Sequence, residues 1–226
     1  NFIKLVPAIS SLEVLTDGSG YSVVVIGDST VANDFPEYLA KAVAQQNSIE
    51  NVGIVGKGLI GNSLMNEGLG LASFIYGESM TNRFYRDVLK EAGVEYVFMK
   101  IGANDIIHPV CEDIISQYPG IKQPTAAEII EGYRRIIKMC HDEGIKIIIA
   151  RITQWKGNTR DYFDSGAQYI RSEEEFMKDW QIAQDVNEWL ANTDEHDGFV
   201  DLTTLSANPL DETALLPEYS VDGMNP

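Results

Sequence analysis

The tetrapeptide Gly27-Asp28-Ser29-Thr30 places a serine hydroxyl directly after an apolar run at 21–26. The run is rich in β-branched residues and predicts a buried strand. Open α/β sheets carry their chemistry where the chain leaves the carboxyl end of a strand, and a serine there can act as a nucleophile. Gly-Asp-Ser is also common in ordinary turns, in which Asp28 would bind nearby backbone N–H groups. This motif alone leaves both interpretations open.

Two further polar segments follow predicted strands. Gly56 comes after a strand expected near 50–55, and Asn104 follows one expected at 94–101. Because parallel strands end at the same edge of a sheet, we expect Ser29, Gly56 and Asn104 to converge. Acyl transfer needs a nucleophile and hydrogen-bond donors directed at the developing oxyanion. A serine N–H, a glycine N–H unobstructed by a Cβ and an asparagine amide supply that set.

In the order and spacing of these residues, the chain resembles the SGNH, or GDSL-type, hydrolases. The matching motifs span nearly its whole length: Gly-Asp-Ser-Thr at 27–30, Asn-x-Gly-x-x-Gly at 51–56, Gly-x-Asn-Asp at 102–105 and Val-Asp-Gly-Met-Asn-Pro at 221–226. The resemblance implies that Ser29 is the nucleophile. The oxyanion hole would comprise the N–H groups of Ser29 and Gly56 and the side chain of Asn104. Asp222 would orient the general base, and no metal or organic cofactor is implied.

The last motif departs from the family pattern at one position. The family's block reads Asp-x-x-His-Pro, whereas Asn225 stands here where the basic histidine is expected. An amide has no basic nitrogen near neutral pH, so Asn225 cannot take the proton of the serine. Of the three histidines, His108 follows the third predicted strand and is a conceivable substitute base, or an ordinary loop histidine. The expected base is therefore missing.

The segments 83–89 and 102–106 resemble the branch of the family related to acetylxylan esterases. That resemblance implies a serine esterase or deacylase of small acyl esters, with O-acetylated plant polysaccharide as substrate. Because of Asn225, we expect activity to be impaired. One alternative is a non-catalytic protein that binds carbohydrate or ester and keeps the pocket without the base. Another is that Asn225 was introduced into an ordinary enzyme.

The remaining elements alternate between strand and helix. We expect helices near 35–46, 82–91, 126–143 and 172–191, and strands at 145–150 and 199–202. Capping boxes at 125–128 and 172–175 predict two of the helix starts. This order predicts a flavodoxin-like three-layer α/β sandwich with a parallel sheet of about five strands, as in SGNH hydrolases. The missing Gly-x-Ser-x-Gly elbow argues against the α/β-hydrolase fold.

Composition limits the partners. The net charge of −17 over 226 residues argues against nucleic acid and anionic membrane surfaces as partners, because both repel an acidic protein. It fits a small-molecule or polysaccharide ester as substrate, and leaves the oligomeric state open. A signal peptide is not visible, but a mature secreted protein would look the same, so the location stays open, with secreted favoured over cytoplasmic. We expect one domain over 1–226, which in this family usually continues into a closing helix.

Two loops beyond the predicted strands hold further candidates. Asp105 is expected to support its own loop, which carries Asn104, through bonds to nearby backbone. The segment 153–162 is polar with the aromatic side chains Trp155 and Tyr162. That composition is typical of a loop that stacks on sugar rings, and equally of an ordinary surface loop.

Overall fold

The computed structural model describes residues 12–67, 76–111, 114–115, 120–158, 171–220 and 223. Its centre is a five-stranded sheet in the order β2-β1-β3-β4-β5, and all neighbouring strands are parallel. The strands are β1 (Tyr21–Gly27), β2 (Val52–Gly58), β3 (Val94–Lys100), β4 (Lys146–Ala150) and β5 (Gly198–Val200). The predicted parallel α/β sheet is confirmed.

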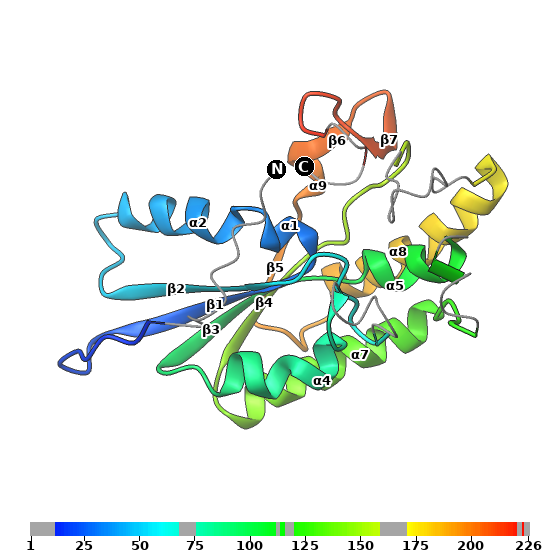
Figure 1. Cartoon of the computed structure of the whole chain (residues 1–226). Helices are drawn as coiled ribbons and strands as arrows, with labels where there is room; N and C mark the ends of the chain where they lie inside the picture. Colours follow the sequence, from blue (N-terminus) through cyan, green and yellow to red (C-terminus); the bar gives the residue numbers. More distant parts are fainter. Residues whose placement is uncertain are drawn as a thin grey trace.

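Helices cover both faces of this sheet (Figure 1). On one face lie α1 (Ser29–Ala32) and α2 (Phe35–Ala44), and on the other lie α4 (Met80–Phe84) and α7 (Ala126–Asp142). A π-helical turn, Tyr85–Leu89, continues α4. After β3 come α5 (Ala103–Ile107) and the 3₁₀ turn His108–Val110, and α8 (Glu173–Asn192) packs against α5 and α7. The layered arrangement predicted from the β-α alternation is thus observed.

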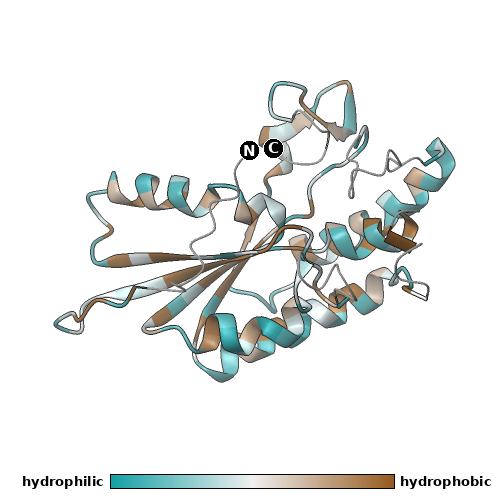
Figure 2. Cartoon of the chain, viewed as in Figure 1, coloured by the Kyte–Doolittle hydropathy of each residue, from teal (hydrophilic) through white to brown (hydrophobic). Residues whose placement is uncertain are grey.

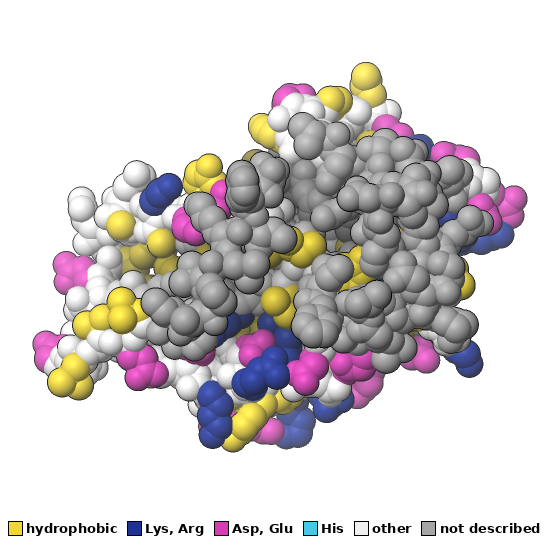
Figure 3. Space-filling view, in the orientation of Figure 1, with side chains coloured by type: hydrophobic (Ala, Val, Ile, Leu, Met, Phe, Trp, Pro, Cys, Tyr) yellow, Lys and Arg dark blue, Asp and Glu magenta, His cyan; other side chains and the backbone are white. Residues whose placement is uncertain are grey.

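Local sequence signals account for the helix starts. Both predicted capping boxes are present. The Thr125 and Ser172 side chains accept from the backbone N–H groups of Glu128 and Glu175, and the carboxylates of these glutamates accept from the backbone N–H groups of Thr125 and Ser172. Apolar residues concentrate along the strands, and polar residues line the outer helix faces (Figure 2). In the space-filling view, acidic and basic side chains mingle along the lower rim, where α4 and α7 lie (Figure 3).

Two predicted element bounds were wrong, and one pair of strands was missed. β2 ends at Gly58, not near 55, because its glycines continue the ladder, with Gly56 opposite Val25 and Gly58 opposite Gly27. The helix expected from 82 begins at Met80. The antiparallel pair β6 (Ala207–Asn208) and β7 (Asp211–Leu215), preceded by α9 (Thr203–Ser206), was missed. Strand pairing is a tertiary contact, so glycine-rich or two-residue strands leave little local signal.

Candidate active site

Ser29 lies where β1 ends and the chain turns back into α1. Asp28 caps this helix, and its Oδ1 accepts from the Thr30 N–H at 3.0 Å, which confirms the turn role expected for Asp28. The turn is tight: a Cβ on Gly27 would lie 2.3 Å from the Lys100 carbonyl oxygen and 2.5 Å from Val31 Cγ2. Only glycine fits there. Ser29 is itself 2% exposed, so the surrounding fold determines what its hydroxyl can contact.

A buried lysine that the sequence reasoning missed holds the same turn. Lys100 is the last residue of β3, and its Nζ donates to Thr30 Oγ1 at 2.9 Å and lies 3.7 Å from Asp28 Oδ1. Burying an ammonium is costly unless it is paired, and these two contacts provide the pairing. The signal in the sequence is a single cation at the end of an apolar strand. Lys100 therefore joins the end of β3 to both residues that flank Ser29.

Asn104 lies at the same edge, in the first turn of α5. The chain reaches it through Gly102, whose φ of 116° favours glycine. Asn104 is 1% exposed, and its Nδ2 donates to the carbonyl oxygen of Asn62 at 2.9 Å. An amide nitrogen carries two hydrogens, so this bond fixes the side chain and leaves a second N–H for a ligand.

Asp105 holds a distant segment and does not support its own loop, which corrects the expectation above. Its carboxylate accepts from the N–H groups of Leu64 at 2.7 Å, Met65 at 2.9 Å and Asn66 at 3.4 Å. These belong to residues 59–66, which follow β2 and are called the site loop below. Burial raises the pKa of Asp105 to about 6, against the opposing effect of four backbone N–H donors, those of Leu64, Met65, Asn66 and Asp105 itself.

Arg83 in α4 fastens the site loop from the other side. It is 1% exposed, and its Nε and Nη2 donate to Asn62 Oδ1 at 3.0 and 2.9 Å. Its Nη1 and Nη2 also donate to the carbonyl oxygens of Lys57, at 3.0 Å, and Gly27, at 3.3 Å. The planar guanidinium therefore ties the ends of β1 and β2 to the residue that receives the Asn104 amide.

The structure does not place Gly56 at the end of its strand. Gly56 lies two residues before the end of β2, about 7 Å below the edge at the usual rise per residue. A Cβ there would meet Pro36 Cγ at 2.8 Å, so this position faces α2. Gly61 lies in the site loop beside Asn62, with a φ of 70°, and a Cβ there would meet Tyr76 Cδ1 at 2.1 Å. The spacing Gly-x-x-Gly occurs at 58–61 as well as at 53–56, which is the signal that could have found it.

A small cavity of about 10 Å³ adjoins Ser29. It has room for about one water-sized group. The described residues around it come from the ends of β1 and β3, from the first residue of α5 and from the segment after β4: Asp28, Ser29, Thr30, Lys100, Ala103, Thr153, Gln154 and Trp155. The cavity therefore brings Ser29 together with Ala103, the residue next to Asn104.

Trp155 is part of the core, which corrects the expectation of a surface or sugar-stacking loop at this residue. It is 1% exposed, and its ring meets those of Phe176 and Trp180 edge-on, with centroids 6.0 and 5.2 Å apart. Its faces are therefore not available to a sugar ring. Tyr162, the other aromatic of that segment, lies outside the described residues.

The predicted acid and the residue at the base position, Asp222 and Asn225, also lie outside the described residues. Within the described lining of the Ser29 cavity there is no histidine. His108 is 4% exposed and stacks on Tyr76, with ring centroids 4.9 Å apart. The structure thus gives His108 a packing contact and does not place it in that lining.

No group of three or more histidine, cysteine or carboxylate side chains suited to a metal ion occurs among the described residues. Over the same part of the chain, no helix is both long and apolar enough to cross a membrane.

A family model for GDSL-like lipases and acylhydrolases matches residues 15–226. The chain belongs to this family. The order of its motifs and the parallel sheet that carries Ser29 and Asn104 agree with that assignment. The family establishes an ester hydrolase or acylhydrolase as the class of protein, and it confirms the resemblance inferred from the motifs.

Solved structures share the fold at low sequence identity. The acetyl xylan esterase AlAXEase is 15% identical, with 90% of each chain covered and a TM-score of 0.59. A catalytic mutant of Axe2, an acetylxylan esterase from Geobacillus stearothermophilus, is 16% identical over 92% of this chain and 88% of that one, with a TM-score of 0.57. A GDSL-like lipase from Bacteroides thetaiotaomicron is 15% identical over 91% and 79%, with a TM-score of 0.57. No curated protein matches the sequence.

Proposed function

We propose that this chain is a serine esterase of small acyl esters in which Ser29 is the nucleophile and catalysis is weakened by Asn225. The observation that supports it best is the convergence of the Ser29 turn, the Asn104 loop and the site loop at one sheet edge. Arg83 spans the ends of β1 and β2, and Asn104 binds Asn62. In that arrangement a nucleophile and a side-chain amide donor can serve one carbonyl group.

The reaction has two steps. Ser29 Oγ forms a bond to the ester carbonyl carbon and passes its proton to water in the unaltered chain, or to the introduced histidine in Asn225→His, and the alcohol then leaves with that proton. Water cleaves the resulting acyl-enzyme and releases the acid. The second N–H of Asn104 and the backbone N–H of Ser29 would stabilise the oxyanion. We assign the glycine N–H of the hole to Gly61 in preference to Gly56, because Gly61 lies in the site loop beside Asn62.

O-acetylated plant polysaccharide is the substrate that we propose for this esterase. Its support is the resemblance of segments 83–89 and 102–106 to the acetylxylan-esterase branch, and the shared fold with two acetylxylan esterases. A simple acetyl ester and acetylated xylan, assayed side by side, test the chemistry and the substrate separately.

The decisive experiment supplies the missing base. We expect Asn225→His to raise hydrolysis of p-nitrophenyl acetate about a thousandfold, because losing the histidine of a Ser-His-Asp triad typically costs several orders of magnitude. Asn225→Gln is the matched control, since it keeps an amide and adds no base. The gain must disappear in Asn225→His/Ser29→Ala. A gain that survives Ser29→Ala would contradict the assignment of the nucleophile.

The presence of Asn225 also favours a second function, a non-catalytic protein that binds ester or carbohydrate. It predicts that acetylated xylo-oligosaccharide binds to the unaltered chain without turnover, and that Asn225→His in a folded protein gains nothing. High activity of the unaltered chain that His108→Ala abolishes would instead identify His108 as the base.

A further inference from the structure

Gln154 is one of the residues that line the Ser29 cavity. It lies in the segment that follows β4 and is 2% exposed. Its Oε1 is buried and has no hydrogen-bond partner among the described residues. Most buried polar atoms are hydrogen-bonded, and one left without a partner costs roughly 1–3 kcal/mol. An unpaired acceptor on a residue that lines the same cavity as Ser29 therefore points to a ligand.

The lysine of the same cavity is occupied elsewhere. Lys100 Nζ donates to Thr30 Oγ1 at 2.9 Å and pairs with Asp28. Both contacts belong to the turn that carries Ser29, and the third N–H of the ammonium does not reach Gln154 Oε1, which has no partner among the described residues. A bound ligand is therefore a better source of a donor for Gln154 Oε1 than a residue of the cavity lining.

We propose that Gln154 Oε1 accepts a hydrogen bond from a hydroxyl group of the substrate, on the carbon next to the one that bears the ester. This deepens the proposed function, on which it rests. The cavity of about 10 Å³ leaves a gap of roughly one water-sized group beside Ser29. A hydroxyl matches that size, and the small gap requires the hydroxyl to lie only a few bonds from the carbonyl that Ser29 attacks. The substrate class is therefore a monoacylated vicinal diol.

Such a contact selects against esters that lack the donor. A site with a buried acceptor disfavours an analogue without the matching hydroxyl, because the acceptor then stays unpaired in the complex. Fluorine in place of the hydroxyl is of similar size and removes the donated hydrogen without adding bulk to the small gap. A higher affinity for the hydroxy ester than for this analogue therefore indicates a hydrogen-bond acceptor in the protein.

The test measures binding in the Ser29→Ala variant, which prevents turnover, by amide chemical-shift titration. The two ligands are 2-hydroxyethyl acetate and 2-fluoroethyl acetate. We expect the hydroxy ester to bind about tenfold more tightly, as one buried hydrogen bond allows. Equal affinities would overturn the proposal, and this comparison needs no change at Gln154.

Substitutions then locate the acceptor. We expect Gln154→Met to abolish the preference, because it keeps the length of the side chain without an acceptor, and Gln154→Glu to retain it. Gln46→Met makes the same change at an exposed residue after α2 and should leave the preference intact. A preference that persists in folded Gln154→Met would contradict the role of Gln154.

Kinetics separate this inference from the proposed function. In the Asn225→His background, the two acetates should differ about tenfold in kcat/KM, and Gln154→Met should remove the difference. Absence of hydrolysis of either ester would contradict the esterase function, while the binding comparison would still decide the role of Gln154. Hydrolysis of both esters at equal rates would contradict the hydroxyl contact alone.

Discussion

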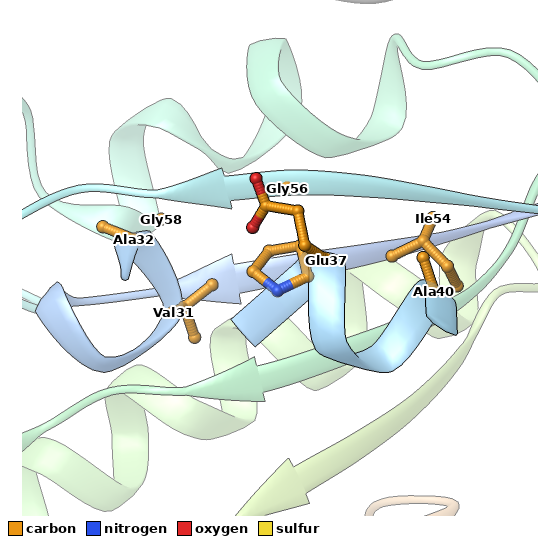
Figure 4. A pocket seen from close by; sticks show the side chains of 8 residues that line it. Val31, Ala32, Glu37, Ala40, Ile54, Gly56 and Gly58 are labelled. Atoms are coloured by element: carbon orange, nitrogen blue, oxygen red, sulfur yellow. The ribbon is translucent and has the colours of Figure 1, made fainter. Parts of the chain in front are cut away.

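The site loop and helix α2 both flank β2, yet they are held in opposite ways. The site loop, residues 59–66, is fixed by buried polar groups, with Asp105 on three of its N–H groups and Arg83 on Asn62. Helix α2 has no fully buried residue. Beneath it lies a cavity of about 390 Å³, lined by Glu37 and Ala40 of α2 and by Ile54 and Gly56 of β2 (Figure 4).

This difference indicates that the site loop is held in place more firmly than helix α2. Buried polar networks in a low-dielectric interior specify one geometry, because each unsatisfied group is costly. A helix without a fully buried side chain, lying over a cavity, is expected to tolerate displacement more readily than a loop held by buried polar groups. We therefore expect the site loop that follows β2 to be rigid and the part of β2 under α2 to tolerate substitution.

The largest effect is expected from Asp105→Ala. Three buried backbone N–H groups would lose their acceptor, so we expect the free energy of unfolding to fall by about 4 kcal/mol. Urea denaturation measures this loss. Asp185→Ala on the exposed face of α8 is the matched control and should cost less than about 1 kcal/mol. Similar costs at the two positions would refute the view that buried polar groups hold the site loop.

Arg83→Met should come next, with a loss of about 3 kcal/mol, because Asn62 Oδ1 and two strand-end carbonyls lose a buried donor. The control is Arg86→Met, in the π-helical turn that continues α4. The side chain of Arg86 is 62% exposed and pairs with Glu78 and Asp87. Exposed pairs contribute less than about 1 kcal/mol. If the two substitutions cost the same, the guanidinium of Arg83 does not fasten the loop.

The pKa of Asp105 makes the stability of the site loop depend on pH. The pKa of about 6 in the folded state lies above the ordinary aspartate pKa of 3.8, so the folded state binds the proton more tightly. Protonation of Asp105 therefore contributes to the free energy of unfolding fully below pH 3.8. That contribution, about 2–3 kcal/mol, is lost as the pH rises to 6. Unfolding of the unaltered chain and Asp105→Asn across this range should show the difference between them shrink. A difference that grows with pH would show that the N–H donors outweigh burial.

The smallest effect is expected from filling the cavity beneath α2. Ala40→Leu adds apolar volume there and should raise the unfolding free energy by about 0.5–1 kcal/mol. The same change at Ala103, which is buried beside Asn104, should cost about 2 kcal/mol through overpacking. Thermal or urea unfolding of both variants checks the signs. Destabilisation of equal size at the two alanines would remove the contrast between tight and loose regions.

The sequence by itself determined the α/β alternation, the parallel sheet and the family. Apolar runs, two capping boxes and the motifs around Ser29 and Asn104 are local signals, and the structure confirms the elements that they predict. The sequence also showed that Asn225 stands where a basic histidine is expected. That interpretation depends on the chemistry of one side chain and on the spacing of its motif.

Only the tertiary structure decided how the site is held. The pairing of β1 with β2 placed Gly56 below the sheet edge and Gly61 at the site loop, and it could not be read from a glycine-rich segment. The contacts of Asp105 and Arg83 reach the site loop across 39–41 and 21 residues. Such distant partners leave no local pattern, because a buried charge is paired with whatever the fold brings beside it.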